Sequence, residues 1–511
     1  MSESEGSEDA WDFLPKRQSL SQDPPVAGTA PAPETDTDSV DDAWGFLSAR
    51  KAEVLARNDQ QGVPEAVVEH RERGEFRAEM GGVSLKRRAF PMALVLLLVS
   101  VAGFLTEAVA ATQIISLGGP KALLIVYPIG GIGLLLVALL QFRFVDQAGR
   151  LKVLRIAGLL YASAFVVALL MLGASIVPVV AVAVIYLLGD QLNFLVPLLV
   201  WSLAGDEFNV AEGRKVFGWV VAWTYAGQVL GLVFAATSPL LLNQLDVPLT
   251  VVLVIDPIVC LVVAFWLPRK LKGTFAAAGL ARPESLKASI GSARDFINGV
   301  PVWRLFFISS IITFVGGMTL FIGFMSGEEQ IIGDDAAKLQ IYFGSVMLGS
   351  LLICLILQKF FAERMLEKFG IPGVLMILPF ATVVGGILVS VGIWTGNLAW
   401  LAVGLAAWFI PRWSIDENAR RAALALVPDE RRTRVSFLVD LLPVSAGLIA
   451  AGPVAALGLL TDHLWAVPLA AAIVAGVAVP YAIKVRRGWA DSLLNWRLRR
   501  RKQNRSSILG E

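Results

Sequence analysis

Apolar residues in this chain come in long runs that short polar stretches separate. Each run holds about 20 residues, the length that an α-helix rising about 1.5 Å per residue needs to cross a hydrocarbon core of about 30 Å. The runs lie at 90–114, 122–142, 155–174, 177–203, 217–240, 248–267, 303–325, 340–361, 372–394, 397–414, 437–459 and 464–484. The pattern predicts an all-α polytopic membrane protein with about twelve transmembrane helices.

The composition agrees with a membrane protein and excludes two classes of partner. Of the 511 residues, 56% are hydrophobic and 17% are charged, whereas an ordinary soluble domain is about 45–50% apolar and about 25% charged. The net charge of +2 gives no basic field for nucleic acid. Both cysteines, Cys260 and Cys354, lie in apolar runs without metal-ligand spacing. We expect a surrounding lipid bilayer, no nucleic acid, no metal and no cofactor.

Lys and Arg in the short connections orient the helices, because basic loops stay on the cytoplasmic side of a membrane. The two flanks of the helical region and every second connection are rich in Lys and Arg. The alternate connections hold only Lys121 and Lys338. This alternation predicts a multi-pass protein of the cell inner membrane with both termini in the cytoplasm.

Polar segments divide the chain into five parts. Residues 1–88 are rich in Ser, Asp, Glu and Pro, so we expect a disordered cytoplasmic tail. A long charged connection at 268–302 separates two sets of six runs. We therefore expect six-helix bundles at 89–267 and 303–484, and a basic cytoplasmic tail at 485–511.

An internal repeat supports this division into two halves. Arg214 begins the fifth helix and Gly227 follows thirteen residues later, while Arg434 begins the eleventh and Gly447 follows at the same interval. Duplicated halves explain such equal spacing, and many transporters contain them. The two bundles are therefore expected to be related by pseudo-symmetry.

A short motif between the second and third runs carries a family resemblance. The residues Asp146-Gln-Ala-Gly149-Arg150 resemble the cytoplasmic D-x-x-G-R signature of the major facilitator superfamily, whose fold is two six-helix bundles. The Asp can accept from backbone donors, the Gly permits a tight turn, and the cation can pair with acids across the gap. With Arg214 and Arg434, these residues form the predicted cytoplasmic gate. An ordinary turn with membrane-anchoring cations is the alternative.

A second resemblance concerns the junction between the fourth and fifth helices. Residues 201–209 (WSLAGDEFN) and 211–218 (AEGRKVFG) resemble that junction in the nucleotide transporter family, which comprises the ATP/ADP translocases of plastids and intracellular bacteria and their free-living bacterial relatives. The Ala-rich segment, Pro and basic residues at 422–432 are similar to the region before span eleven of that family. The resemblance implies exchange of nucleotides or other phosphate compounds.

Ionisable residues within apolar runs are costly in a membrane and are therefore candidate functional groups. Asp190 and Arg412 fall near the middle of the fourth and tenth runs, which face each other across the cavity of this fold. With Gln191, Asn193 and Glu107 they form the predicted substrate-binding cavity. A structural ion pair that fastens the two halves is the alternative reading of Asp190 and Arg412.

Two further acids lie in the apolar runs. Asp256, beside Pro257 in the sixth run, is a candidate for binding a coupling ion, or it caps a broken helix. Asp440 is one turn inside the eleventh run, where it is expected to pair with Arg431 or Arg434 at the membrane interface. We do not assign Asp440 to the substrate site.

The N-terminal tail contains the motif DAWDFL at 9–14 and DAWGFL at 42–47. Repeated aromatic and aliphatic side chains in a polar tail favour docking to a cytoplasmic protein or to lipid. The predicted docking residues are Trp11, Phe13, Leu14, Trp44, Phe46 and Leu47. A chance repeat is the alternative. The basic segment 486–502 is expected to form an amphipathic helix on the anionic lipid surface.

Together these features favour a secondary active transporter that moves a small polar or anionic solute by alternating access, with nucleotides and phosphate compounds among the candidates. The alternative is a non-transporting membrane scaffold or regulator that recruits cytoplasmic partners through its N-terminal tail. The chain has two histidines, one of them in the tail, and no G-x-S-x-G elbow. We therefore expect no hydrolytic triad and no enzymatic function.

Overall fold

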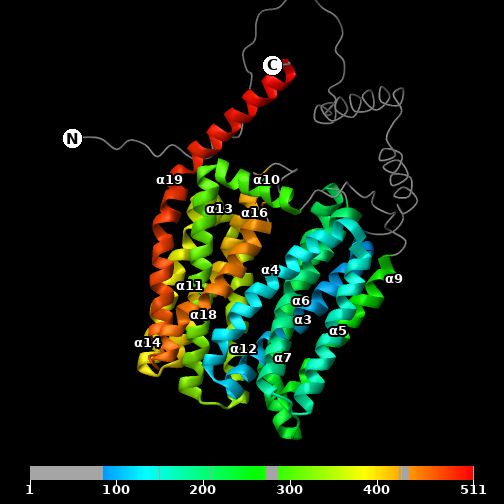
Figure 1. The fold of residues 1–511 in the computed structure, drawn as a ribbon, viewed down its shortest axis with the longest axis vertical. Coiled ribbons are helices and arrows are strands. Elements are labelled where there is room, and N and C mark those ends of the chain that lie inside the picture. The colour runs from blue at the N-terminus through cyan, green and yellow to red at the C-terminus, as the bar shows by residue number, and fades with distance from the viewer. Residues whose placement is uncertain are drawn as a thin grey trace, which may run out of the picture. The chain divides into compact units, whose positions relative to one another are not determined.

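The computed structural model describes residues 85–148, 150–208, 210–271, 286–424, 427, 435 and 437–509. Regular structure within these ranges is helical throughout (Figure 1). Twelve of the described helical segments are long and apolar enough to cross a membrane, and each overlaps one predicted run. The predicted all-α polytopic fold is confirmed, and the chain is a multi-pass membrane protein.

The first six spans form a bundle around its first helix, which packs against the fourth, fifth and sixth spans. The sixth span changes helix type three times along its length, from 3₁₀ to α, to π and back to α. The elements of this half are α3 (Leu85–Gly118), η1 (Pro120–Ala122), α4 (Leu123–Ala148), α5 (Arg150–Gly173), α6 (Pro178–Glu207), α7 (Val210–Leu242), η2 (Asn243–Leu245), η3 (Leu249–Val254), α8 (Ile255–Leu261), η4 (Val262–Trp266) and α9 (Leu267–Leu271).

The second bundle also packs around its first span, α11, whose main neighbours are α14, α18 and α19, the ninth, eleventh and twelfth spans. Its tenth and eleventh spans contain π-helical turns, η5 and η6. The elements of this half are α10 (Leu286–Gly299), α11 (Pro301–Ile332), α12 (Ala336–Phe360), α13 (Ala362–Leu375), α14 (Ile377–Thr395), α15 (Leu398–Pro411), η5 (Arg412–Asp416), α16 (Glu417–Leu424), η6 (Phe437–Leu441), α18 (Leu442–Leu460) and α19 (Ala466–Leu509).

The two bundles meet mainly through two pairs of helices, α4 with α18 and α7 with α12. Glycines allow these backbones to approach closely, as is common between membrane helices. A side chain on Gly131 would overlap the backbone of Ser445, and one on Gly452 would overlap α4. Gly344 of α12 similarly lies against the backbone of Ala236 in α7. Small residues therefore determine how closely the halves pack.

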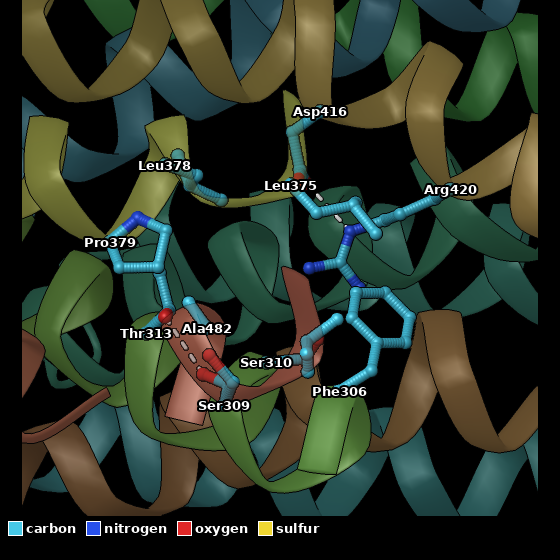
Figure 2. A pocket seen from close by; sticks show the side chains of 11 residues that line it. Phe306, Ser309, Ser310, Thr313, Leu375, Leu378, Pro379, Asp416, Arg420 and Ala482 are labelled. Atoms are coloured by element: carbon cyan, nitrogen blue, oxygen red, sulfur yellow. Dashed lines mark hydrogen bonds and ion pairs between the residues drawn. The ribbon is translucent and has the colours of Figure 1, made fainter. Parts of the chain in front are cut away.

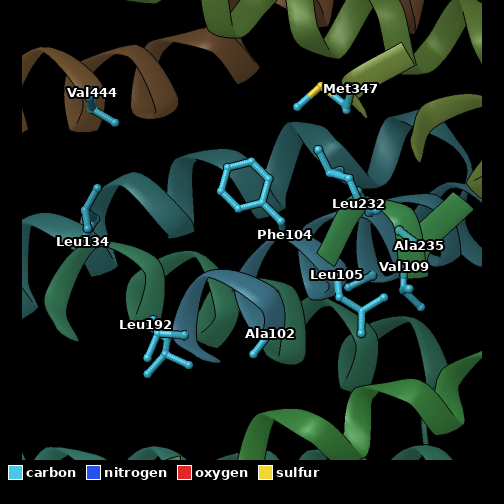
Figure 3. Packing of buried hydrophobic residues seen from close by; sticks show 14 of the residues in the cluster. Ala102, Phe104, Leu105, Val109, Leu134, Leu192, Leu232, Ala235, Met347 and Val444 are labelled. Atoms are coloured by element: carbon cyan, nitrogen blue, oxygen red, sulfur yellow. The ribbon is translucent and has the colours of Figure 1, made fainter. Parts of the chain in front are cut away.

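The apolar core continues from one bundle into the other. Phe104 and Leu105 of α3, Leu192 of α6 and Leu232 of α7 belong to the same buried cluster as Met347 of α12 (Figure 3). A second cluster joins α10 to the start of α11 and to α19, and its aromatic side chains include Phe296, Trp303 and Trp489. Each buried aromatic ring contributes on the order of 150–250 Å² of contact surface.

Two helix ends and the connection between the bundles differ from what the sequence led us to expect. The first helix begins at Leu85, so Lys86, Arg87 and Arg88 are part of α3 and not of the tail. The connection between the bundles contains the helix α10. The last span continues as α19 to Leu509 (Figure 1), instead of ending near 484 and turning onto a lipid surface. Arg, Lys, Leu and Trp within this segment are compatible with a continuous helix.

Candidate functional site

Two acids and two phenols come together in the first bundle. Glu107 of α3 and Asp190 of α6 are close enough for their charges to interact. Tyr127 of α4 and Tyr186 of α6 are stacked, with ring centroids 6.3 Å apart, and both phenols interact electrostatically with both carboxyl groups. Three spans therefore meet at a polar cluster. Its four residues are two acids and two phenols, and none of them is basic.

The two amides beside Asp190 point to different neighbouring helices. The Tyr161 hydroxyl donates to Gln191 Oε1 at 3.0 Å, and the Gln191 amide nitrogen fills the space beside Gly133. The Asn193 amide occupies the space that a side chain on Gly103 would require. The glycines thus make room for both amides. Gln191 faces α5 and α4, whereas Asn193 faces α3.

Asp256 is fully buried in α8 and is attached to α3. The Thr106 hydroxyl donates to Asp256 Oδ2 at 2.6 Å, whereas Oδ1 has no hydrogen-bond partner among the described residues. Thr106 directly precedes Glu107 in the chain. Asp256, the candidate for binding a coupling ion, is therefore held against α3, the helix that carries Glu107. Its carboxyl group contacts Thr106 rather than Glu107.

The two acids closest to Arg412 lie in its own span, and Asp440 of the eleventh span also interacts with it. Its Nη1 lies 2.9 Å from Glu417 Oε2 and 3.8 Å from Asp416 Oδ2, and its guanidinium lies 4.9 Å from the centre of the Phe314 ring. Among the described residues Arg412 forms no ion pair with Asp190. Pro411 ends α15 directly before the wide π-helical turn that carries Arg412, and such turns often occur at functional sites.

A buried ion pair next to Arg412 borders a small cavity (Figure 2). Arg420 Nε lies 2.6 Å from Asp416 Oδ2, and Arg420 Nη1 donates to the Val439 carbonyl at 3.3 Å. The guanidinium also lies 5.2 Å from the centre of the Phe306 ring. Ser310, whose hydroxyl has no partner among the described residues, lines the same cavity, which has room for about one water molecule.

The first bundle has a corresponding buried cation. Arg88 Nη2 lies 3.0 Å from Glu207 Oε1, and Arg88 Nη1 lies 3.1 Å from Glu212 Oε1. The guanidinium also lies 5.1 Å from the centre of the Phe208 ring. These contacts join the start of α3 to the junction of α6 and α7. We call the end of the bundles where α3 begins the basic end.

Hydrogen bonds between the bundles concentrate at the other end, which we call the opposite end. Gln340 of α12 is fully buried, and its Nε2 donates to the Ala235 carbonyl at 2.8 Å and to Ser238 Oγ at 2.9 Å. The Ser116 hydroxyl donates to the Asp334 carbonyl at 2.6 Å. We call these five residues the inter-bundle contact. Each of the two sets links one bundle directly to the other.

Two contacts lie outside this set. Lys121 Nζ pairs with Asp462 Oδ1 at 3.1 Å between exposed side chains at the opposite end. Tyr225 of α7 forms a side-chain hydrogen bond with Gln358 of α12, further toward the basic end. Exposed ion pairs contribute about 0–1 kcal/mol. The Gln340 hydrogen bonds of the inter-bundle contact are therefore the main buried polar link between the halves that the described residues provide.

The predicted gate and docking residues are described only in part. The backbone of Asp146 lies in the last turn of α4, Arg150 begins α5, and Arg214 lies in the first turns of α7. Gly149 and Arg434 are outside the described residues, as are the docking residues of the N-terminal tail. These assignments stay predictions.

No protein-family model matches the chain, and a comparison with curated proteins found no match. Solved structures with a similar fold include the nucleoside transporter NupG, with a TM-score of 0.58 and 14% identity over 78% of this chain and 99% of that one. They also include a bacterial homologue of the iron transporter ferroportin in an inward-facing state, with a TM-score of 0.59 and 13% identity over 79% of this chain and 100% of that one. A mutant of a peptide transporter POT in complex with sulfate has a TM-score of 0.57 and 15% identity over 79% of this chain and 95% of that one.

The chain has the major facilitator fold. This confirms the fold expected from the two sets of six runs and from the motif beginning at Asp146. At such low identity the likeness extends to the fold alone, so the resemblance to the nucleotide transporter family stays a prediction.

Sequence reasoning missed three charged groups in this fold. Asp416 and Arg420 follow the tenth apolar run directly, and Glu328 follows the seventh. All three are buried because the helices extend beyond the apolar runs. An acid or a base within one or two helical turns of a run was the signal that could have identified them.

Proposed function

We propose that the protein is a secondary active transporter that moves a small polar solute by alternating access between its two bundles. The observation that carries this proposal is the position of the inter-bundle contact. It joins the halves at one end of the fold, while Glu107, Asp190, Tyr127 and Tyr186 form a polar cluster deeper in the first bundle. Polar groups inside a membrane are costly, so they are usually retained for function.

The charges favour a neutral or cationic polar solute over a polyphosphate. Glu107 and Asp190 are both acidic, and the charge of Arg412 is offset by Glu417 and Asp416. A polyphosphate is best bound by several cations or helix N-termini. An anionic solute would therefore have to displace Glu417 from Arg412, whereas a hydroxyl or ammonium group could bind the acidic cluster directly.

We infer that the basic end faces the cytoplasm of a cell with an inner membrane. Lys86, Arg87 and Arg88 at the start of α3, and Arg269 and Lys270 at the end of the sixth span, support this orientation. In that orientation the inter-bundle contact closes the outer face. Both termini would then be cytoplasmic.

The cytoplasmic gate is part of the same proposal. We propose that Asp146, Gly149, Arg150, Arg214 and Arg434 close the fold at the basic end once the inter-bundle contact has opened. The charged side chains among them would exchange partners between the two states. The motif resemblance and the positions of the neighbouring helix ends support this role.

A second function rests on the tail. We propose that Trp11, Phe13, Leu14, Trp44, Phe46 and Leu47 recruit a cytoplasmic protein, because the same apolar motif occurs twice in a polar segment. Replacing Trp11 and Trp44 together by Ala should abolish recruitment and leave solute uptake unchanged. If both functions are lost together, the tail does not act as a separate docking segment.

The test of the transport function is solute uptake into proteoliposomes, with nucleosides, amino acids, amines and phosphate esters each offered in turn. We expect uptake of one class by the wild type and at least a tenfold loss in Asp190→Asn, because the hydroxyl or ammonium group of the solute loses a charged acceptor in a buried site. Asp246→Asn is the matched control, since Asp246 is an exposed acid in a left-handed conformation that Asn tolerates.

Solute binding to the purified protein distinguishes a variant that folds but cannot bind the solute from a variant that fails to assemble. A solute at about 100 times its dissociation constant should stabilise the folded protein by about 2.7 kcal/mol. We expect this stabilisation in the wild type and in Asp246→Asn, and its loss in Asp190→Asn. Equal stabilisation of all three proteins would remove Asp190 from the binding site.

A further inference from the structure

Three tryptophans among the described residues have exposed side chains, and all three lie at the opposite end of the second bundle. Trp394 is in the last turn of α14, Trp400 is in the first turn of α15, and Trp465 directly precedes α19. Their exposed fractions are 80%, 44% and 41%. We call these three residues the tryptophan patch. None of them belongs to the acidic cluster or to the inter-bundle contact.

The end of α14 brings the three tryptophans together. Gly392 makes room for Trp400, because a side chain on this glycine would lie 3.1 Å from the Trp400 Cβ. The Ser390 hydroxyl donates to the Trp465 carbonyl at 2.7 Å. A tight turn from α14 to α15 passes through Gly396, whose φ of 66° favours glycine. The tryptophan patch is therefore one surface that the local packing of α14 defines.

The opposite end of the first bundle has no corresponding rings. Its three stretches of chain, at 112–126, 166–185 and 235–264, contain no Trp, Tyr or Phe. Exposed side chains at the corresponding connections are aliphatic, among them Ile176 and Leu241. The tryptophans of this bundle lie in the halves of their spans nearer the basic end, at Trp201, Trp219, Trp223 and Trp266.

Tryptophan and aliphatic residues prefer different depths in a membrane. The indole ring has an apolar body and one N–H donor, so Trp is enriched where the hydrocarbon meets the head groups, whereas Leu, Ile and Val are favoured inside the hydrocarbon. The tryptophan patch lies where the ninth apolar run ends and the tenth and twelfth begin. The exposed ion pair of Lys121 with Asp462, three residues before Trp465 in the chain, belongs to the same end. The patch therefore fits the boundary between acyl chains and head groups.

We propose that the tryptophan patch anchors the second bundle to the lipid interface, and that the first bundle has no such anchor at the opposite end. The partner is the boundary between the acyl chains and the head groups of a phospholipid bilayer. Because the three rings carry no charge, binding does not depend on the charge of the head groups. The opposite end of the second bundle then stays at the level of this boundary, whereas that of the first bundle can change its depth in the membrane.

The depth of spin labels in bilayers of different thickness tests the anchor. Labels at Leu460 and Leu241 form a matched pair, because both positions are exposed and lie near the ends of the eleventh and fifth spans. The full-length protein is placed in phosphatidylcholine bilayers of increasing acyl-chain length. The Leu460 label should keep its depth below the phosphates, whereas the Leu241 label should lie deeper as the bilayer thickens. Labels that shift alike in the wild type would overturn the proposal.

Variants of the patch test whether the tryptophans form the anchor. Trp394→Leu, Trp400→Leu and Trp465→Leu together should make the Leu460 label shift as much as the Leu241 label. The same three positions changed to Tyr are the matched control and should keep the wild-type depths, because Tyr also prefers the interface. Trp394→Leu alone changes only the most exposed ring, so it should fold and give a partial shift. An unchanged Leu460 depth in both Leu variants would overturn the anchor and would indicate that protein covers the patch.

Because the proposed transport function requires the bundles to separate, the anchor also determines which half moves at the opposite end. In Gln340→Leu, which loses its hydrogen bonds to α7, the Leu241 label should shift from its wild-type depth and the Leu460 label should not. Equal shifts, or none, would contradict this movement. The lipid series needs neither a solute nor opening, so a loss of uptake with a constant Leu460 depth would reject the transport function and leave the anchor intact.

Discussion

The two ends of the fold use polar contacts in different ways. At the basic end, Arg88 binds Glu207 and Arg420 binds Asp416, and each ion pair stays within one bundle. At the opposite end, the buried hydrogen bonds of Gln340 cross from one bundle to the other. The buried ion pairs thus hold each bundle together, while neutral hydrogen bonds and the exposed pair of Lys121 with Asp462 hold the bundles to each other. Such a distribution suits two bodies that separate at one end without unfolding.

The largest effect is expected from breaking an ion pair within a bundle. Arg420→Ala leaves Asp416 buried without its closest cation, which should lower the free energy of unfolding by about 3–5 kcal/mol. Arg421→Ala is the matched control, because the side chain of Arg421 is 67% exposed and its pair with Glu417 should contribute only about 0–1 kcal/mol. Denaturation of the purified proteins measures both, and equal losses would show that Arg420 has no special structural role.

A smaller effect is expected at the inter-bundle contact. Gln340→Leu removes two hydrogen bonds between the bundles, each with a net contribution of about 0.5–1.5 kcal/mol. The expected result is a larger open population at the opposite end with little change in the stability of each bundle. Distances between spin labels on the two bundles measure the open population, and thermal denaturation measures the stability. A loss of stability as large as that of Arg420→Ala, without opening, would contradict the distinction between the two ends.

The smallest effect concerns the start of α12, next to the inter-bundle contact. The Asp335 carboxylate caps this helix by accepting from the Ala337 and Lys338 amides at 3.1 and 3.2 Å. Asp335→Ala should cost about 1 kcal/mol, and Asp335→Asn much less, because Asn is also a good cap. Thermal denaturation of the two variants checks this order, which would be wrong if Asn and Ala behaved alike.

The same residue predicts a response to pH. The side chain and backbone of Lys338 lower the pKa of Asp335 below its ordinary value. An acid whose pKa is lower in the folded state stabilises the fold above its unfolded pKa, and this contribution disappears as the pH falls through the folded pKa. Acidification should therefore reduce the difference between wild type and Asp335→Ala.

The sequence predicted the fold because the evidence for it is local and repeated. Runs of about 20 apolar residues specify membrane helices one by one, and basic connections order them. Helix ends were predicted less well. α3 starts before its apolar run, and α11 continues beyond its own through Glu328 to Ile332. A helix that packs inside a bundle can extend past the lipid core, and hydropathy contains no information about that packing.

The candidate site was predicted only in its parts. Depth along each helix identified polar groups inside the apolar runs, but rotation about the helix axis decides which of them meet. The structure pairs Glu107 with Asp190 and places Arg412 beside Glu417, five residues further along its own chain. A pairing of Arg412 with Glu417 depends on the π-helical turn after Pro411, which the sequence did not reveal.

The central claim is that two rigid bundles separate at the opposite end. Spin-label distances measured between both bundles and within each bundle test it most directly. Labels at Leu245 and Trp394 report on the opposite end, and labels at Ile156 and Phe369 report on the basic end, all at exposed positions. With a transported solute present, the first distance should lengthen and the second shorten, while the distances from Leu245 to Ile156 and from Trp394 to Phe369 stay constant. Distances within one bundle that change as much as those between the bundles would contradict the account.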